Sequence, residues 1–184
     1  MRLPRLTTNR CLLRLAEPQD LLEVLRYWRE NGSRYSPALP GALLTEAYWE
    51  ERILLALREL QDESTCKLYV FEREQQRIAG TITFTDIKRG FQHQCALGYG
   101  LSGEHEGRGL MTEAASRAIE LVFDELKLHR IEASYHESNL RSARVLERLG
   151  FQREGVLRDA MWIDGAWQSQ ILTARLNPSW TPPK

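Results

Sequence analysis

The segment CALGYGLSGEHEGRGLMTEA, residues 95–114, constrains the fold of this chain more than any other stretch. Residues 95–102 have the composition of a strand, and an apolar stripe at helical spacing begins at Leu110. Between them Gly107 and Gly109 flank an arginine, a placement typical of backbone that turns tightly or approaches a ligand closely. The segment therefore predicts a strand, a glycine loop and the start of a helix in immediate succession.

The rest of the chain alternates between strand-like and helix-like periodicity. Helices are expected over residues 17–31, 45–61, 110–126 and 139–150. Strands are expected over residues 11–17, 66–72, 77–87, 95–102, 130–137, 154–163 and 166–176. This order implies an α+β fold, in which helices flank a mixed, mostly antiparallel sheet and one strand–helix–strand (βαβ) crossover surrounds the glycine loop.

Local signals mark the ends and connections of these elements. Residues 31–45 collect Gly, Ser and Pro and predict a long loop. Asp164–Gly165 predicts a two-residue hairpin between the last two strands. Thr45 and Asn139 are suited to cap the helices that they begin, and Gly150 is suited to end one.

Length and charge indicate the class of protein. A chain of 184 residues favours a single domain spanning 1–184. Because 25 basic and 25 acidic residues give zero net charge, we expect no strong non-specific binding to nucleic acid. No apolar run reaches the roughly 18 residues of a membrane span, and the first residues lack the apolar core of a signal peptide. We therefore expect a cytoplasmic protein without a membrane segment.

The three cysteines, Cys11, Cys66 and Cys95, lie far apart in the sequence. Their odd number argues against a disulfide framework, and they form no metal-ligand spacing with the four histidines. We expect no metal site, and we expect these cysteines to be small buried residues of a protein kept in a reducing compartment.

The glycine loop suits a phosphate group. The first N–H groups of a helix have no partner within the helix, and the positive end of the helix dipole lies behind them. A diphosphate would satisfy these groups, while Gly107 and Gly109 would let the backbone approach it and Arg108 would add charge at the rim. The Walker pattern is absent, and Thr112 stands where a dinucleotide motif needs its third glycine. A tight turn that only caps the helix remains the alternative.

A second polar group follows the strand expected at 130–137. Asn139 is a good helix N-cap, and Ser142 lies three residues further on. The crossover brings the end of this strand beside the glycine loop. The two side chains could therefore face whatever the loop binds.

GYGLSGEHEGRGLMTEA and LHRIEASYHESNLRSARVLERLGFQREGVLRD resemble the acetyl-CoA-dependent N-acetyltransferases of the GNAT superfamily. More narrowly, they are similar to the bacterial ribosomal-protein-alanine N-acetyltransferases of the RimJ type, over nearly the whole chain. The family motif is Gln or Arg, two residues, Gly, one residue, then Gly or Ala. Gly107 and Gly109 match it, whereas Glu104 occupies the Gln or Arg position.

The resemblance implies acetyl-CoA as cosubstrate and direct transfer of its acetyl group to an amine. It implies that main-chain groups of the strand bind the pantetheine arm and that the loop binds the diphosphate. The residues concerned are Tyr99, Gly100, Leu101, His105, Glu106, Gly107, Arg108, Gly109, Leu110 and Asn139. Ser142 is the candidate to hydrogen-bond or protonate the departing thiolate, and Tyr135 is a second candidate for the same role.

The acceptor that the resemblance implies is the N-terminal α-amine, with alanine as the first residue, of a small-subunit ribosomal protein. An α-amine with a pKa of about 7.7–8.0 is partly neutral at pH 7, so a weak base or a water chain would suffice. Glu132, Asp86 and Glu137 are candidates for such a base, although each is more typical of a solvated carboxylate. Two alternatives stay open, namely acetylation of a small amine (an amino sugar, a polyamine or an antibiotic) and a non-catalytic ribosome-assembly module.

Overall fold

A computed structural model describes residues 3–35, 45–163 and 165–182. Within these residues eight strands form one sheet in the order β1-β2-β3-β4-β5-β6-β8-β7. The strands are β1 (Arg5–Thr7), β2 (Cys11–Arg14), β3 (Cys66–Glu72), β4 (Ile78–Lys88), β5 (Gln94–Leu101), β6 (Arg130–His136), β7 (Gln152–Ile163) and β8 (Ala166–Leu176). The α-helices are α1 (Leu21–Tyr35), α2 (Glu46–Gln61), α3 (Leu110–Asp124) and α4 (Leu140–Arg148), and 3-10 helices occupy Pro18–Asp20 and Gly103–His105.

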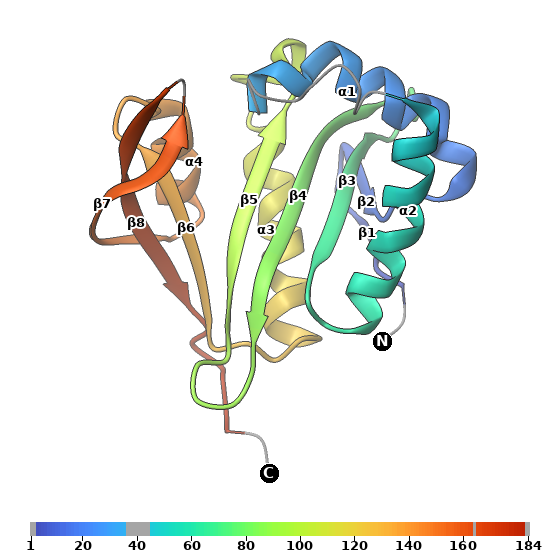
Figure 1. The fold of residues 1–184 in the computed structure, drawn as a ribbon. Helices are drawn as coiled ribbons and strands as arrows, with labels where there is room; N and C mark the ends of the chain where they lie inside the picture. The colour runs from blue at the N-terminus through green and yellow to red at the C-terminus, as the bar shows by residue number, and fades with distance from the viewer. Residues whose placement is uncertain (1–2, 36–44, 164, 183–184) are drawn as a thin grey trace.

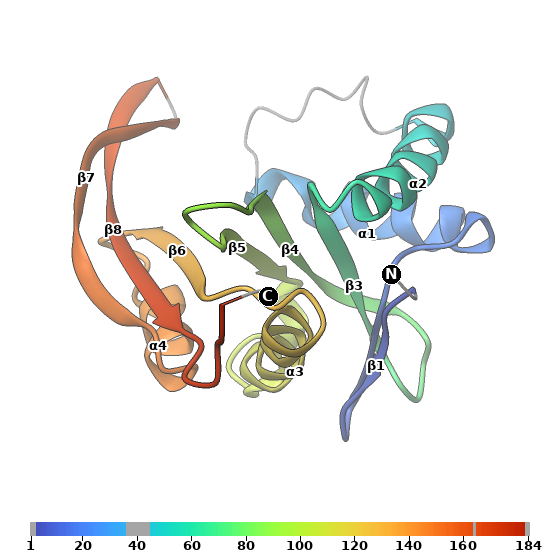
Figure 2. The same ribbon diagram turned by 90° about the horizontal axis from the view of Figure 1, so that it is seen from below.

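The helices cover both faces of the sheet (Figures 1 and 2), with α1 and α2 on one face and α3 and α4 on the other. The larger core lies between the sheet and α3, whose alanines Ala114, Ala115 and Ala118 are fully buried and let the helix approach the strands closely. The smaller core packs α1 and α2 against β3. The predicted mixed, mostly antiparallel α+β sheet flanked by helices is confirmed.

All three cysteines lie in the larger core, as expected for small buried residues. Burial raises the pKa of Cys66 and of Cys95 to about 12, and that of Cys11 to about 11. These thiols stay protonated near neutral pH and are therefore poor nucleophiles.

The predicted crossover runs from β5 through α3 to β6, and β5 and β6 form the one parallel pair of the described strands. Their pairing extends only from Gln94↔Arg130 to Ala96↔Glu132. Beyond Ala96, β5 keeps its partner β4 as far as Leu101, but β6 diverges from it (Figure 1). Main-chain groups on one edge of β5 are thus left open to a ligand.

Helix α1 corrects one prediction. It extends to Tyr35, so residues 31–35 are helical rather than part of the loop expected at 31–45; residues 36–44 lie outside the described residues. Asn31 is buried and its side-chain amide donates to the carbonyl of Tyr27 at 3.0 Å. Tertiary packing therefore overrides the loop-like composition at this point.

Two further observations concern the first strand and the last hairpin. The three-residue strand β1 was not predicted, and it pairs with β2 through Leu6↔Leu13. The hairpin of the last two strands closes at Ile163↔Ala166, and Asp164 of its predicted turn lies outside the described residues.

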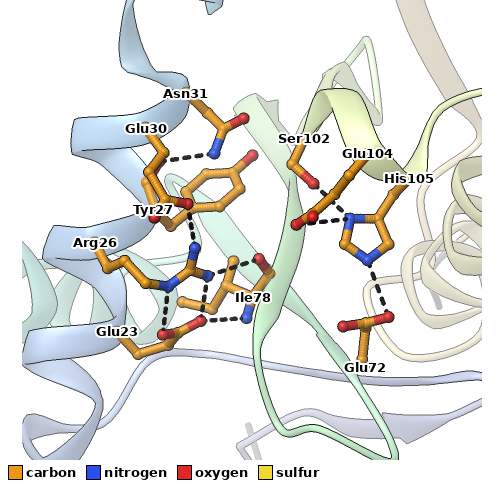
Figure 3. A network of polar contacts seen from close by, with 10 residues as sticks. All are labelled: Glu23, Arg26, Tyr27, Glu30, Asn31, Glu72, Ile78, Ser102, Glu104 and His105. Atoms are coloured by element: carbon orange, nitrogen blue, oxygen red, sulfur yellow. Dashed lines mark hydrogen bonds and ion pairs between the residues drawn. The ribbon is translucent and has the colours of Figure 1, made fainter.

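Helix α1 is fixed to the sheet by an ion-paired carboxylate (Figure 3). Glu23 accepts from the backbone N–H of Ile78 at 2.6 Å and from two nitrogens of Arg26 at 2.6 and 2.8 Å. Burial alone would raise the pKa of Glu23, but these hydrogen bonds outweigh it and hold the pKa below its usual range. The carboxylate therefore stays charged and holds α1 against the start of β4.

Candidate functional site

A cavity of about 750 Å³ lies between β5, the glycine loop, α3 and α4. It is lined by Arg34, Tyr99, Gly100, Leu101, His105, Glu106, Gly107, Gly109, Leu110, Met111, Thr112, Asn139, Arg141, Ser142, Arg144, Val145 and Arg148. All the candidate site residues predicted from the resemblance line this cavity except Arg108 and Tyr135. The crossover thus brings β5, the glycine loop and α4 together as predicted, whereas Arg34 of α1 joins them from outside the crossover.

The glycine loop is shaped for a close backbone approach. Gly107 and Gly109 have φ values of +75° and +72°, in the left-handed region that favours glycine. A Cβ built on Gly107 would meet no described atom within 4 Å, so it would point into open space. Gly109 is the N-cap of α3 and has no side chain to satisfy the first N–H groups of the helix. An anion in the cavity would satisfy them.

Thr112 supplies an observation that the sequence reasoning missed. Its hydroxyl Oγ1 is buried at the start of α3 and has no hydrogen-bond partner among the described residues. Buried hydroxyl groups are usually hydrogen-bonded, so this atom indicates a ligand group in the cavity. A phosphate oxygen would accept from it, and the diphosphate of acetyl-CoA therefore fits this part of the site.

The cavity is positively charged although the whole chain is neutral. Four arginines and one carboxylate line it. Arg141, Arg144 and Arg148 recur at helical spacing on one face of α4, and Arg34 comes from the end of α1. This lining suits a polyanion such as coenzyme A, and sequence reasoning had assigned none of these arginines.

Arg108 contributes through its backbone. Its carbonyl accepts from Nη1 of Arg10 at 2.9 Å, while its side chain does not line the cavity. Arg10 also pairs with Glu113 of α3 at 2.7 Å, so the loop between β1 and β2 supports the glycine loop. Arg108 is thus not among the residues that line the cavity, and its contribution to the charge at the rim stays a prediction.

His105 is a positioning residue in this structure (Figure 3). Its ring is buried, with Nδ1 at 2.5 Å from the hydroxyl of Ser102 and Nε2 at 2.9 Å from the carboxylate of Glu72. Both ring nitrogens therefore contact side chains of the protein and are not free to bind a ligand. They hold the 3-10 turn that presents the glycine loop against the end of β3.

Two hydroxyl groups meet inside the cavity. The Tyr99 hydroxyl lies 2.8 Å from Oγ of Ser142 and also donates to the Ser142 carbonyl at 3.2 Å. Burial raises the pKa of Tyr99 to about 12, against a smaller opposing effect of the hydrogen bond to Ser142. The phenol is therefore a protonated donor near neutral pH. Asn139 caps α4 by accepting from the Ser142 N–H at 3.1 Å, which confirms its predicted capping role.

The remaining candidates lie elsewhere. Tyr135 packs against the larger core and does not line the cavity. Glu132 is paired with Arg130 at 2.9 Å, Asp86 is exposed, and Glu137 lines a separate cavity of about 490 Å³ beside β7 and β8. The structure therefore brings none of the three proposed bases to the glycine-loop cavity.

Residues 3–35, 45–163 and 165–182 contain no group of three or more His, Cys, Asp and Glu side chains placed to hold a metal ion. Nor do they contain a helix long and apolar enough to cross a membrane.

Comparison with known proteins gives consistent matches. The family model described as an acetyltransferase (GNAT) domain matches residues 10–152. The [Ribosomal protein uS5]-alanine N-acetyltransferase of Escherichia coli (strain K12) is 35% identical over 97% of this chain and 93% of its own length. The probable N-acetyltransferase YjcK of Bacillus subtilis (strain 168) is 38% identical over 70% of this chain and 71% of its own length.

A solved structure also covers nearly the whole chain. The ribosomal-protein-S5-alanine acetyltransferase from Vibrio fischeri superposes with a TM-score of 0.91 at 30% identity. The match covers 97% of this chain and 100% of that one.

Proposed function

This chain belongs to the GNAT family of acetyltransferases, and on that premise we propose that it acetylates the N-terminal α-amine of a small-subunit ribosomal protein, with alanine as the first residue. It is an acetyl-CoA-dependent N-acetyltransferase. The observation that supports this acceptor is the similarity, over nearly the full length of both chains, to the Escherichia coli enzyme named for uS5 alanine. Such an acceptor implies a cytoplasmic enzyme.

We assign the glycine-loop cavity to acetyl-CoA. Acetyl-CoA supplies the thioester whose carbonyl an amine attacks, with coenzyme A leaving as a thiolate. Backbone N–H groups from Gly107 to Leu110 and the free Thr112 hydroxyl would hold the diphosphate. The open edge of β5 beyond Ala96 would bind the pantetheine arm through main-chain groups and direct an N–H at the carbonyl. Holding both reactants in place supplies much of the rate enhancement.

The leaving thiolate requires a hydrogen-bond donor near the open end of β5. Ser142 and Tyr99 meet this requirement together, because their hydroxyl groups are hydrogen-bonded and both residues line the cavity. The Tyr99 hydroxyl is protonated near neutral pH, and by turning its proton from the Ser142 carbonyl to Ser142 Oγ it would support donation by Ser142 as charge develops on sulfur. We therefore keep Ser142 as the candidate donor and add Tyr99 as the residue that orients it.

Substituting Ser142 with alanine should lower single-turnover rates by about 10- to 100-fold, because the contact strengthens only as negative charge develops. Coenzyme A affinity measured by calorimetry should change by less than about threefold, since the contact to the ground state is weak. Ser134→Ala is the matched control, because Ser134 lies on β6 outside the cavity lining. Rates equal to those of the parent protein would remove Ser142 from the mechanism.

Thiol release from acetyl-CoA tests the acceptor class. A peptide that begins with alanine and follows the N-terminus of the small-subunit protein should be acetylated at least about tenfold more efficiently than spermidine or an amino sugar, a difference of about 1.4 kcal/mol. Faster release with a small amine would favour the first alternative. Binding of acetyl-CoA without release by any acceptor would favour the non-catalytic module.

A further inference from the structure

Glu106 connects two distant arginines across the cavity. Its Oε1 lies 2.5 Å from Nη2 of Arg34 at the end of α1, and its Oε2 accepts from Nη1 of Arg141 on α4. The two guanidinium groups are thus held by a single carboxylate, and all three side chains line the cavity. We call this set the Glu106 bridge.

The guanidinium of Arg34 also lies close to the backbone of Gly103. A Cβ built on Gly103 would lie 2.8 Å from Nη1 of Arg34, so the guanidinium lies directly against this glycine. Any larger residue at position 103 would displace it. The side chain of Glu106 is 27% exposed, whereas those of Arg34 and Arg141 are 43% and 78% exposed. The carboxylate therefore lies deeper than either of its partners.

We propose that Glu106 is an internal anion that holds Arg34 and Arg141 until the diphosphate of acetyl-CoA replaces it between them. Both arginines would then be phosphate ligands, one of them supplied by α1, and Glu106 would oppose cofactor binding. This inference rests on the proposed placement of acetyl-CoA in the glycine-loop cavity.

The exchange follows from charge and geometry. Two guanidinium groups facing one cavity repel each other unless an anion lies between them. A carboxylate carries one negative charge, whereas a diphosphate carries more charge and offers more acceptor oxygens for the planar donor groups of arginine. Glu106 follows His105 and directly precedes Gly107, so its carboxylate lies beside the loop that would bind the same diphosphate. The two anions would therefore compete for the same two guanidinium groups, and we expect the more highly charged diphosphate to displace the carboxylate.

Calorimetry with coenzyme A tests the exchange at fixed low salt. Glu106→Gln should tighten coenzyme A binding by about three- to tenfold, because two partly exposed ion pairs no longer compete with the ligand. Pantetheine, which has no phosphate, should bind both proteins equally. Glu147→Gln is the matched control, since Glu147 has the same charge, is exposed on α4, the helix that carries Arg141, and does not line the cavity.

Substitutions of the two arginines distinguish the Glu106 bridge from simple repulsion of phosphate by Glu106. In a protein carrying Arg34→Gln and Arg141→Gln, the added Glu106→Gln substitution should not tighten coenzyme A binding, because no guanidinium group remains for it to release to the phosphate. The proposal is wrong if the gain persists in that protein, if Glu147→Gln tightens binding equally, or if Glu106→Gln does not tighten it. Gly107→Val distinguishes failure of the Glu106 exchange from failure of the cofactor site on which it rests. Unchanged coenzyme A binding by that variant would reject the cofactor site itself.

Discussion

Replacing Gly107 with valine is expected to weaken coenzyme A and acetyl-CoA binding by at least about 100-fold, because at least two hydrogen bonds to charged phosphate, each contributing roughly 1.5–3 kcal/mol, would be lost. In the protein a Cβ at this position would meet no described atom within 4 Å. The added side chain would therefore occupy the space of the cavity and keep a phosphate away from the N–H groups of the loop.

The same substitution also strains the backbone. Gly107 has a φ of +75°, which a β-branched residue adopts only at a cost of about 1–2 kcal/mol. Weaker binding could therefore arise from a distorted loop or a less stable protein rather than from a filled cavity. The control must reproduce the strain without blocking the site.

Gly90 offers that control. It has a φ of +68° in the connection between β4 and β5, and a Cβ there would also meet no described atom within 4 Å. Gly90→Val should lower the melting temperature about as much as Gly107→Val while leaving coenzyme A affinity within about twofold, since the strain is the same at both sites. A folded Gly107→Val protein with parental affinity in calorimetry would show that the loop does not bind the cofactor.

The larger elements of the fold were predictable because each has its own periodicity and end signals. Thr45 caps helix α2 by accepting from the Tyr48 N–H, and Gly150 follows the end of α4 with a φ of +79°. Strand β1 has three residues and only Leu6 among them is buried, which is too short for a periodic pattern. The family resemblance and the fold it implied are confirmed.

The site was predictable where its chemistry lies in the backbone. The spacing of Gly107 and Gly109 is visible in the sequence, and backbone N–H groups follow from the start of α3. Arg34 was not predictable, because its contact with Glu106 spans 72 residues and depends on how α1 crosses the sheet. Thr112 was considered only as a missing glycine, and its buried, unpartnered hydroxyl is evident only in three dimensions.

The base is the part of the mechanism for which the structure brings none of the candidates from the sequence, Glu132, Asp86 and Glu137, to the glycine-loop cavity. None of the carboxylates proposed for this role lines the glycine-loop cavity, and Glu132 is already paired with Arg130. An acceptor that needs only weak base assistance fits this arrangement. An α-amine has a pKa of about 7.7–8.0, whereas a lysine amine has a pKa of about 10.4 and is almost wholly charged near pH 7.

Blocking the N-terminus of an alanine-starting peptide with a formyl group should therefore abolish its acetylation, even when its lysines are free. With the unblocked peptide, kcat/KM should rise between about pH 6.5 and 8.5 and then level off, because the neutral fraction of the α-amine follows its own ionisation. An otherwise identical peptide in which arginine replaces each lysine is the matched control and should react at the same rate. Mass spectrometry that finds acetyl-lysine on the blocked peptide at a comparable rate would contradict the α-amine assignment and identify the enzyme as a lysine acetyltransferase.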